Sequence, residues 1–271
     1  MKKAMRSIED LMNLKGRVAC ITGGAGHIGA ALGESLAELG AAVVVLDRAR
    51  EATEAAAARI GSDYGVATLP LVVDLEDEAA LRAVPDAILR RFQRLDILVH
   101  CAALVGTSDL KGWGVPFAEQ SSATWRRAME VNVTAPFVLT QASADALKAS
   151  GHGSVINVLS IYGLVGPDWG LYEGTAMGNP GAYAASKGGL LQLTRWLATT
   201  LAPHVRVNAI TPGGVWRDPP EEFQARYIAK TPLKRMATEE DFKGAVAYLA
   251  SDLSQYVTGQ NLIADGGWTC W

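Results

Sequence analysis

Short runs rich in valine and isoleucine recur along the chain and alternate with longer amphipathic stretches. Such runs are typical of strands, and they occupy residues 17–22, 42–46, 66–73, 95–101, 154–159, 205–210 and 261–264. Because the runs are apolar on both faces and the stretches between them are helical in pattern, the sheet should be parallel and covered on both sides. The sequence therefore predicts an α/β fold, a doubly wound Rossmann fold with a single parallel sheet of about seven strands.

The composition sets limits on domain number and on partners. With 271 residues and 49% hydrophobic content, the chain can bury a full core as one domain over residues 1–271. A net charge of −3 and the lack of a basic run argue against nucleic acid and favour a small-molecule substrate. No apolar run reaches the roughly 20 residues that cross a bilayer, and the first residues lack the apolar core of a secretory signal. We expect a cytoplasmic protein with no membrane partner.

Cysteine and histidine spacing bears on metal binding. Cys20, Cys101 and Cys270 lie far apart, and the four histidines are scattered. Zinc ligands usually come in closely spaced pairs, which this chain lacks. The sequence predicts reduced cysteines and no bound metal.

A glycine-rich turn follows the first predicted strand. Residues 22–29 read TGGAGHIG and begin a predicted helix that runs to about Gly40, so Gly24, Gly26 and Gly29 match the dinucleotide fingerprint in its expected context. Glycines let the backbone approach a pyrophosphate, whose charge is met by the amino end of the helix. This turn predicts a bound dinucleotide.

Acidic residues at strand ends indicate which dinucleotide. Asp47 ends the second predicted strand, where a carboxylate can accept hydrogen bonds from both adenosine ribose hydroxyls and would repel a 2′-phosphate. NAD is therefore favoured, although Arg48 and Arg50 leave NADP open, since an arginine there can turn toward such a phosphate. Asp74, after the third strand, suits the adenine amino group, with an ordinary strand-end turn as the alternative.

A set of polar residues further along predicts catalysis. Tyr183 and Lys187 lie four residues apart, so they share one helix face. The ammonium should lower the phenol pKa from about 10 and make Tyr183 an acid or base near neutral pH. Ser160 ends a strand, and Asn132 lies in a helical region after Trp125. Singly, each fits an exposed helix pair or a strand-end cap; together with the glycine turn they predict an active site.

These motifs resemble the compact branch of the short-chain dehydrogenase/reductase family. The matching features are the glycine turn, Asp74, the four polar residues above, Pro212-Gly213, Thr258-Gly259-Gln260 and Asp265-Gly266-Gly267. The resemblance implies an NAD(H)-dependent oxidoreductase that interconverts a secondary alcohol and a ketone. It also implies that Lys187 bonds the nicotinamide ribose, that Ser160 holds the substrate oxygen, and that Asn132 anchors a proton-relaying water.

The resemblance further implies a set of cofactor-binding residues. They are Gly23, Gly24, Gly26, His27, Ile28, Gly29, Asp47, Arg48, Asp74, Leu75, Cys101, Ala102, Ala103, Tyr183, Lys187, Pro212, Gly213 and Val215. Three positions depart from the family pattern. His27 replaces a glycine, and we expect it to fill space at the helix start, with contact to a cofactor phosphate as the alternative. His100-Cys101-Ala102-Ala103 replaces Asn-Asn-Ala-Gly, and Val215 replaces a threonine, so its backbone should bond the nicotinamide amide.

Two irregular segments should form the substrate pocket. Residues 163–180 are an insertion over the active site, and residues 212–232 are a substrate-lid region. The expected pocket residues are Ser160, Tyr162, Trp169, Tyr172, Glu173 and Trp216. Aromatic, carboxylate and hydroxyl groups together suit a polyhydroxylated substrate. The insertion and residues 231–236 (TPLKRM) also resemble members of bacterial surface-sugar and flagellin-modification pathways, including legionaminic acid synthesis.

The substrate is therefore predicted to be a sugar or a sugar derivative. The alternatives are a 3-oxoacyl thioester reductase, a simple polyol dehydrogenase, or a cofactor-bound scaffold without turnover. The family resemblance implies a homotetramer or homodimer, formed through helices around 134–150 and 183–201 and through C-terminal strands. Trp268 and Trp271 fit burial against a neighbouring subunit or against their own.

Overall fold

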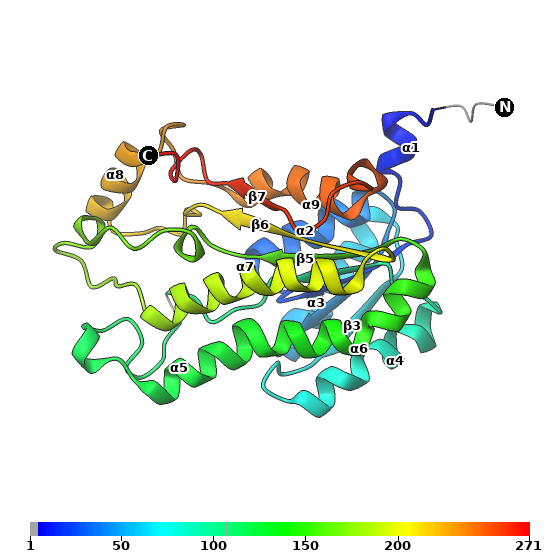
Figure 1. Cartoon of the computed structure of the whole chain (residues 1–271), viewed down its shortest axis with the longest axis horizontal. Coiled ribbons are helices and arrows are strands. Elements are labelled where there is room, and N and C mark those ends of the chain that lie inside the picture. Colours follow the sequence, from blue (N-terminus) through cyan, green and yellow to red (C-terminus); the bar gives the residue numbers. More distant parts are fainter. Residues whose placement is uncertain (1–4, 107) are drawn as a thin grey trace.

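A parallel sheet forms the centre of the computed structural model, which describes residues 5–106 and 108–271 (Figure 1). Its strand order is β3-β2-β1-β4-β5-β6-β7, and every neighbouring pair is parallel. The strands are β1 Val18–Thr22, β2 Ala42–Asp47, β3 Thr68–Val72, β4 Ile97–His100, β5 Gly153–Val158, β6 Val205–Pro212 and β7 Asn261–Ala264. Each lies within two residues of its predicted ends, and the predicted fold class is confirmed.

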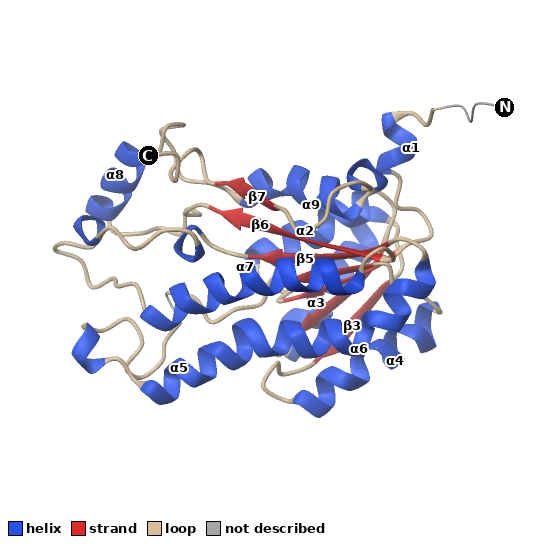
Figure 2. Cartoon of the chain, viewed as in Figure 1, coloured by secondary structure: helices blue, strands red, loops and turns tan. Residues whose placement is uncertain are grey.

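Helices cover both faces of the sheet (Figure 2). One face packs against α2, α3 and α9, and the other against α4, α6 and α7. The α-helices are α1 Ile8–Met12, α2 His27–Glu38, α3 Arg50–Tyr64, α4 Glu78–Phe92, α5 Ser122–Met129, α6 Ala135–Ser150, α7 Gly181–Leu201, α8 Glu221–Lys230 and α9 Lys243–Ala250. The shorter turns are η1 Phe117–Glu119, η2 Glu130–Thr134, η3 Ile161–Gly163, η4 Trp169–Leu171, η5 Glu239–Phe242 and η6 Asp252–Ser254.

Strand β1 shows why the strands are apolar throughout. Ala19 and Ile21 belong to the core on one face, while Val18 and Cys20 belong to the core on the other. Successive side chains of a strand point to opposite faces, so a strand covered on both sides must be apolar at every position. All five residues of β1 are buried.

The strand order places a ligand site at one edge of the sheet. The chain leaves β1 on one side to form β2 and β3 and then returns to the other side as β4. In open α/β sheets, ligands bind at the carboxyl ends of the strands, where the order reverses in this way. The glycine turn follows β1 directly, so it lies at that point.

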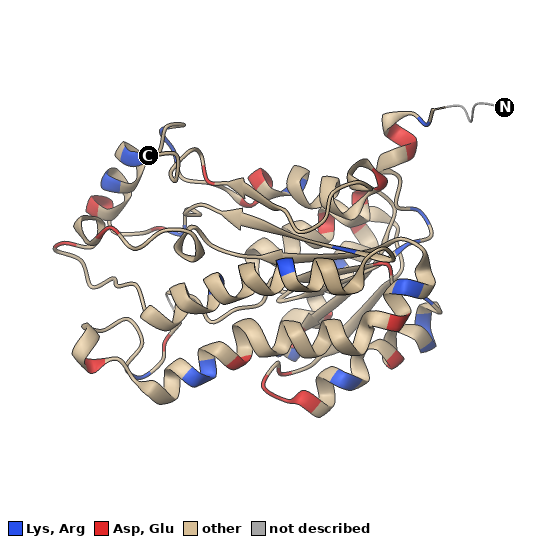
Figure 3. Ribbon diagram, in the orientation of Figure 1, with Lys and Arg blue, Asp and Glu red and all other residues tan. Residues whose placement is uncertain are grey.

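Positions of basic and acidic residues lie intermixed along the helices, and few lie on the strands (Figure 3). Within residues 5–106 and 108–271, no three histidine, cysteine or acidic side chains gather as a metal site. In the same residues, no helix is long and apolar enough to cross a membrane.

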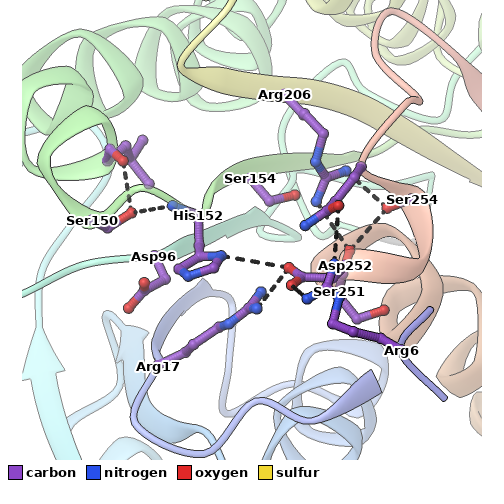
Figure 4. Close-up of polar contacts among 12 residues, drawn as sticks. Arg6, Arg17, Asp96, Ser150, His152, Ser154, Arg206, Ser251, Asp252 and Ser254 are labelled. Atoms are coloured by element: carbon purple, nitrogen blue, oxygen red, sulfur yellow. Dashed lines mark hydrogen bonds and ion pairs between the residues drawn. The ribbon is translucent and has the colours of Figure 1, made fainter. Parts of the chain in front are cut away.

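An ion-pair network joins the amino ends of several strands, opposite the ligand site (Figure 4). Asp252 accepts hydrogen bonds from Arg6 and Arg17, each at 2.6 Å, and His152 Nδ1 lies 3.5 Å from the same carboxylate. Burial opposes the charged form of Asp252, but the bonds from Arg6 and Arg17 outweigh it and lower its pKa. The network fastens the segment before α1 to η6.

Candidate active site

A cavity of about 1210 Å³ opens at the carboxyl ends of the strands. Pockets for a single small ligand usually measure roughly 300–1,000 Å³, so this cavity has room for a dinucleotide and a substrate together. Apart from Gly24, all of the residues that the sequence assigned to the cofactor line it. Gly24 packs beneath the turn, where its amide donates to the Leu46 carbonyl at 3.2 Å.

The glycine turn is shaped for close packing against α2. Gly23 has a φ of 68°, in the left-handed region that favours glycine. A β-carbon on Gly29 would collide with the Gly23 carbonyl oxygen. The first amides of α2 receive no side-chain cap at Gly26, so they are free to bond phosphate oxygens. The turn therefore fits a dinucleotide pyrophosphate.

Asp47 is held beside this turn at the end of β2. Its Oδ1 accepts from the Arg48 amide at 2.7 Å, and its Oδ2 accepts from the Ala25 amide at 3.3 Å. Each carboxylate oxygen keeps a further lone pair, which suits the two hydroxyls of a ribose. Asp74 also lines the cavity, and its Oδ1 accepts from the Glu76 amide at 3.0 Å in a strand-end turn.

Tyr183 and Lys187 lie in the first two turns of α7, and both line the cavity. Lys187 Nζ donates to the Val158 carbonyl at 2.7 Å and lies 5.9 Å from the centre of the Tyr183 ring. Burial lowers the pKa of Lys187 to about 8. Burial raises the pKa of Tyr183, and its interaction with Ser160 only partly opposes that shift. The pKa of Tyr183 is therefore raised rather than lowered as expected, because burial outweighs the influences that favour the ionised phenol.

Ser160 follows β5 and faces the cavity beside Tyr183. The Ser160 hydroxyl interacts with the Tyr183 phenol in the sense that lowers the pKa of Tyr183. Ser160 Oγ also accepts from the Tyr162 amide at 3.2 Å, which fixes its position at the start of η3. Two neighbouring hydroxyls on one cavity wall can bind a single alcohol or carbonyl oxygen between them.

Asn132 lies in the π-helical turn η2 and is buried. Its Oδ1 accepts from the Leu104 amide at 2.8 Å, while its Nδ2 donates to the Leu104 carbonyl at 3.0 Å and to Ser186 Oγ at 2.9 Å. The side chain thus joins the segment after β4 to α7, near Tyr183. It does not line the cavity in the described residues, and the water that it was expected to anchor stays a prediction.

His27 differs from the expectation that it fills space at the start of α2. Its side chain is 76% exposed at the cavity wall, because the first turn of α2 directs it outward toward η5. There His27 Nδ1 lies 3.9 Å from Glu239 Oε1, and Arg217 Nη2 bonds the same oxygen at 2.7 Å.

Aromatic side chains form the substrate end of the cavity. Tyr162 and Tyr172 line it as expected, and their hydroxyls lie 2.6 Å apart. Phe223 and Tyr227 of α8 also line it, with ring centres 6.0 Å apart. The sequence reasoning missed them, although their spacing of four residues in an amphipathic stretch is a usable signal. It also missed Asn179, for which an Asn-Pro pair indicates only a turn.

Three residues that were expected in this pocket lie outside the cavity wall. Trp169 is 58% exposed and packs against Tyr172, with ring centres 5.8 Å apart. Trp216 is 48% exposed, and Glu173 is exposed with its carbonyl accepting from Arg226 at 2.5 Å. The loop packs inward through Leu171 and Tyr172, whereas Trp169 and Glu173 face outward.

The loop over the site is fixed to α7 at its first residue. A β-carbon on Gly163 would lie 2.8 Å from the Lys187 backbone carbonyl carbon. Only glycine allows η3 to approach α7 this closely. The position of residues 164–180 is therefore tied to the helix that carries Tyr183 and Lys187.

Comparison with known proteins identifies the family. A family model described as "Enoyl-(Acyl carrier protein) reductase" matches residues 23–269. A solved short-chain type dehydrogenase/reductase from Mycobacterium marinum superimposes with a TM-score of 0.85 at 30% identity, covering 98% of this chain and 100% of that one. The chain belongs to the short-chain dehydrogenase/reductase family. The predicted resemblance to its compact branch is confirmed.

Other relatives of this short-chain dehydrogenase/reductase have named activities. The cis-4-hydroxycyclohexanecarboxylate dehydrogenase of Sinomonas cyclohexanicum is 36% identical over 260 residues, covering 93% of this chain and 96% of the relative. The galactitol 2-dehydrogenase (L-tagatose-forming) of Cereibacter sphaeroides is 32% identical over 272 residues, covering 96% of this chain and 98% of the relative. A gluconate 5-dehydrogenase from Burkholderia cenocepacia, solved with NADP and tartrate, has a TM-score of 0.86 at 30% identity, covering 98% and 100%.

Family membership and the cavity together establish the class of reaction. This short-chain dehydrogenase/reductase is an oxidoreductase that acts on CH–OH groups with a nicotinamide cofactor, as the sequence predicted. When bound, the nicotinamide ring supplies the acceptor or donor of the hydride.

Proposed function

We propose that the enzyme interconverts a secondary alcohol and a ketone on a polyol or another sugar-derived substrate, with NAD(H) as cofactor. The observation that carries this proposal is that Ser160 and Tyr183 line the same cavity as the glycine turn and Asp47. The galactitol 2-dehydrogenase and the gluconate 5-dehydrogenase among its relatives support a polyhydroxylated substrate.

The catalytic residues divide the work as follows. Ser160 and Tyr183 bind the substrate oxygen; in the reduction Tyr183 donates its proton to the carbonyl oxygen, and in the oxidation the Tyr183 phenolate takes that proton from the hydroxyl. A bound nicotinamide would supply or accept the hydride at the carbon. Lys187 holds the nicotinamide ribose with its buried ammonium group. Asn132 positions α7 through its bond to Ser186 at 2.9 Å.

A screen of substrates tests the proposal. Purified protein is assayed with NAD⁺ and NADP⁺ against galactitol, D-threitol, gluconate and 4-hydroxycyclohexanecarboxylate by absorbance of the reduced cofactor. We expect the highest kcat/KM with a polyol and NAD⁺. The family model's description favours an acyl thioester as the second candidate, so acetoacetyl thioester reduction is measured in parallel. A higher kcat/KM for the thioester than for every polyol would show that the proposed substrate class is wrong.

The cellular location, the oligomeric state and the domain organisation are also proposed. We place the enzyme in the cytoplasm, as a homotetramer or homodimer that pairs through α6, α7 and β7. Exposed apolar side chains on α7 and β7 support this assembly, namely Trp196, Leu262 and Ile263. Residues 1–271 act as one domain, in which residues 163–180 and 212–232 cover the substrate.

A further inference from the structure

Asn179 has a buried oxygen without a hydrogen-bond partner. The residue is 6% exposed and lines the cavity just before α7. Its Oδ1 bonds no other atom within residues 5–106 and 108–271. Buried polar atoms in native proteins are nearly always satisfied, so an orphan acceptor on a cavity wall indicates a donor on the ligand.

The backbone around Asn179 is held in place. Pro180, with a φ of −69°, is the N-cap of α7, and the Gly181 amide donates to Gln120 Oε1 at 3.1 Å. Asn179 lies four residues before Tyr183. Its carboxamide is therefore positioned by the same helix start that positions the catalytic phenol.

A pair of hydroxyls on the same wall supplies a donor. The hydroxyl oxygens of Tyr162 and Tyr172 lie 2.6 Å apart, and either hydroxyl can donate to the other. Only one of the two protons is used in that bond, so the accepting hydroxyl keeps its own proton for a ligand. Both tyrosines line the cavity. The wall therefore presents one acceptor, Asn179 Oδ1, and one donor from the Tyr162–Tyr172 pair.

We propose that Asn179 and this tyrosine pair bind a second hydroxyl group of the substrate, apart from the hydroxyl that reacts at Ser160 and Tyr183. A hydroxyl both donates and accepts, whereas a carboxylate only accepts and an acyl chain does neither. The cations on the cavity wall do not favour a carboxylate at this place: Arg48 and Lys187 are assigned to the cofactor, and Arg217 is paired with Glu239 at 2.7 Å. This inference rests on the proposed function and narrows its substrate to compounds with at least two hydroxyls.

Matched pairs of alcohols test the inference. Cyclohexane-1,4-diol is compared with cyclohexanol, and D-threitol with 2-butanol, for the wild type, Asn179→Leu and Tyr172→Phe. We expect the clearest result in the pair whose polyol the wild type oxidises with the higher kcat/KM. For that polyol, Asn179→Leu should lower kcat/KM by about ten- to a hundredfold, as loss of a hydrogen bond in a desolvated site does. The kcat/KM for the monoalcohol should change less than about threefold. Tyr172→Phe keeps the ring packing. It should also lower kcat/KM more for the polyol than for the monoalcohol, but by a smaller factor than Asn179→Leu.

The variants need a readout for folding and a control. NADH affinity, measured by fluorescence, should be unchanged in both, because neither residue is among those assigned to the cofactor. Met177→Leu changes a neighbouring cavity residue and should keep the wild-type ratio of polyol to monoalcohol activity. If Asn179→Leu lost the same factor in kcat/KM for the polyol and for the monoalcohol, Asn179 would be a structural residue and the inference would be overturned. A wild-type preference for 4-hydroxycyclohexanecarboxylate over the diol would do the same.

Binding without turnover separates this inference from the proposed function. Binding of each polyol to the enzyme–NADH complex is followed by tryptophan fluorescence. If the wild type binds a polyol, loses that binding in Asn179→Leu and oxidises no alcohol, the proposed function fails and the inference holds. If the wild type oxidises alcohols while Asn179→Leu keeps the same preference, the inference fails alone. If no polyol binds or reacts, both are wrong.

Discussion

At position 183, two influences act on one hydroxyl group. Burial keeps the proton on Tyr183, while the interaction with Ser160 eases its release. Before cofactor binds, the phenol is therefore a proton donor. This matches the reductive direction, in which the carbonyl oxygen must receive a proton.

Replacing that hydroxyl should abolish turnover and leave binding intact. For Tyr183→Phe we expect kcat to fall by about 10²- to 10⁴-fold, the usual contribution of a general acid or base. NADH affinity should stay within about twofold of the wild type, since the aromatic ring remains. Steady-state kinetics and fluorescence titration measure the two quantities. Full activity in this variant would remove Tyr183 from the mechanism.

Asp47 should decide between the two nicotinamide cofactors. Its carboxylate is fixed by two backbone amides, so it cannot easily turn away from a 2′-phosphate. In Asp47→Ala, we expect kcat/KM for NAD⁺ to fall by about tenfold or more, and the preference for NAD⁺ over NADP⁺ to shrink or reverse. Asp74→Ala is the matched control, because it should weaken both cofactors alike. An unchanged ratio in Asp47→Ala contradicts the assignment.

Lys187 gives the cofactor affinity a pH dependence. Burial lowers its pKa to about 8, so the ammonium that should hold the nicotinamide ribose is present below that pH and is lost above it. We expect the Kd for NADH to rise as pH increases through about 8. Lys187→Arg, which stays charged, should bind NADH with little change over the same range. An NADH affinity in the wild type that is flat across this range would contradict the assignment.

At the scale of elements, strands were easier to predict from the sequence than loops. A strand such as β1 is buried on both sides, so its residues must be apolar at every position, and this pattern is visible in the local sequence. The loop before α7 depends on distant partners: Tyr172 faces inward because Phe223, far along the chain, packs against it with ring centres 5.5 Å apart. No local pattern shows this contact. For that reason Trp169 and Glu173 were placed in the pocket, and Asn179 was missed.

The network at the opposite end of the strands should matter for stability. Asp252 is 6% exposed and Arg17 is 9% exposed, and breaking a buried pair of this kind costs about 3–5 kcal/mol. We expect Asp252→Asn to lower the free energy of unfolding by about that amount, measured with urea. Arg6 is 43% exposed, so Arg6→Ala should cost only about 0–1 kcal/mol. Equal effects of the two variants would mean that the network does not act through its buried pair.

The same network should stabilise the protein less at acidic pH. The pKa of Asp252 is lowered in the folded protein, so its contribution is fully present above the unfolded value and is lost as pH falls through the folded value. Wild type and Asp252→Asn should therefore converge in stability at low pH. Urea unfolding across the acid range measures this convergence.

At the scale of the whole molecule, one edge of the sheet stays apolar and exposed. Within residues 5–106 and 108–271, strand β7 pairs with β6 alone, and its Leu262 and Ile263 are 40% and 46% exposed. Apolar side chains on a sheet edge are typical of an interface between subunits. We expect Leu262→Asp to shift the assembly to a smaller species in light scattering. Phe117→Asp, at an equally apolar exposed position on η1, should leave the assembly unchanged.

The close contact at Gly163 affects how such an enzyme can acquire new substrates in evolution. Gly163 ties the covering loop to the backbone of Lys187, while the loop beyond it contacts α8 and the aromatic residues. Substitutions within 164–180 can therefore change what the enzyme accepts while the proton-transferring residues keep their places. A side chain at position 163 would displace Lys187 itself. Selection for new substrates can therefore change residues 164–180 but must keep the glycine directly before them.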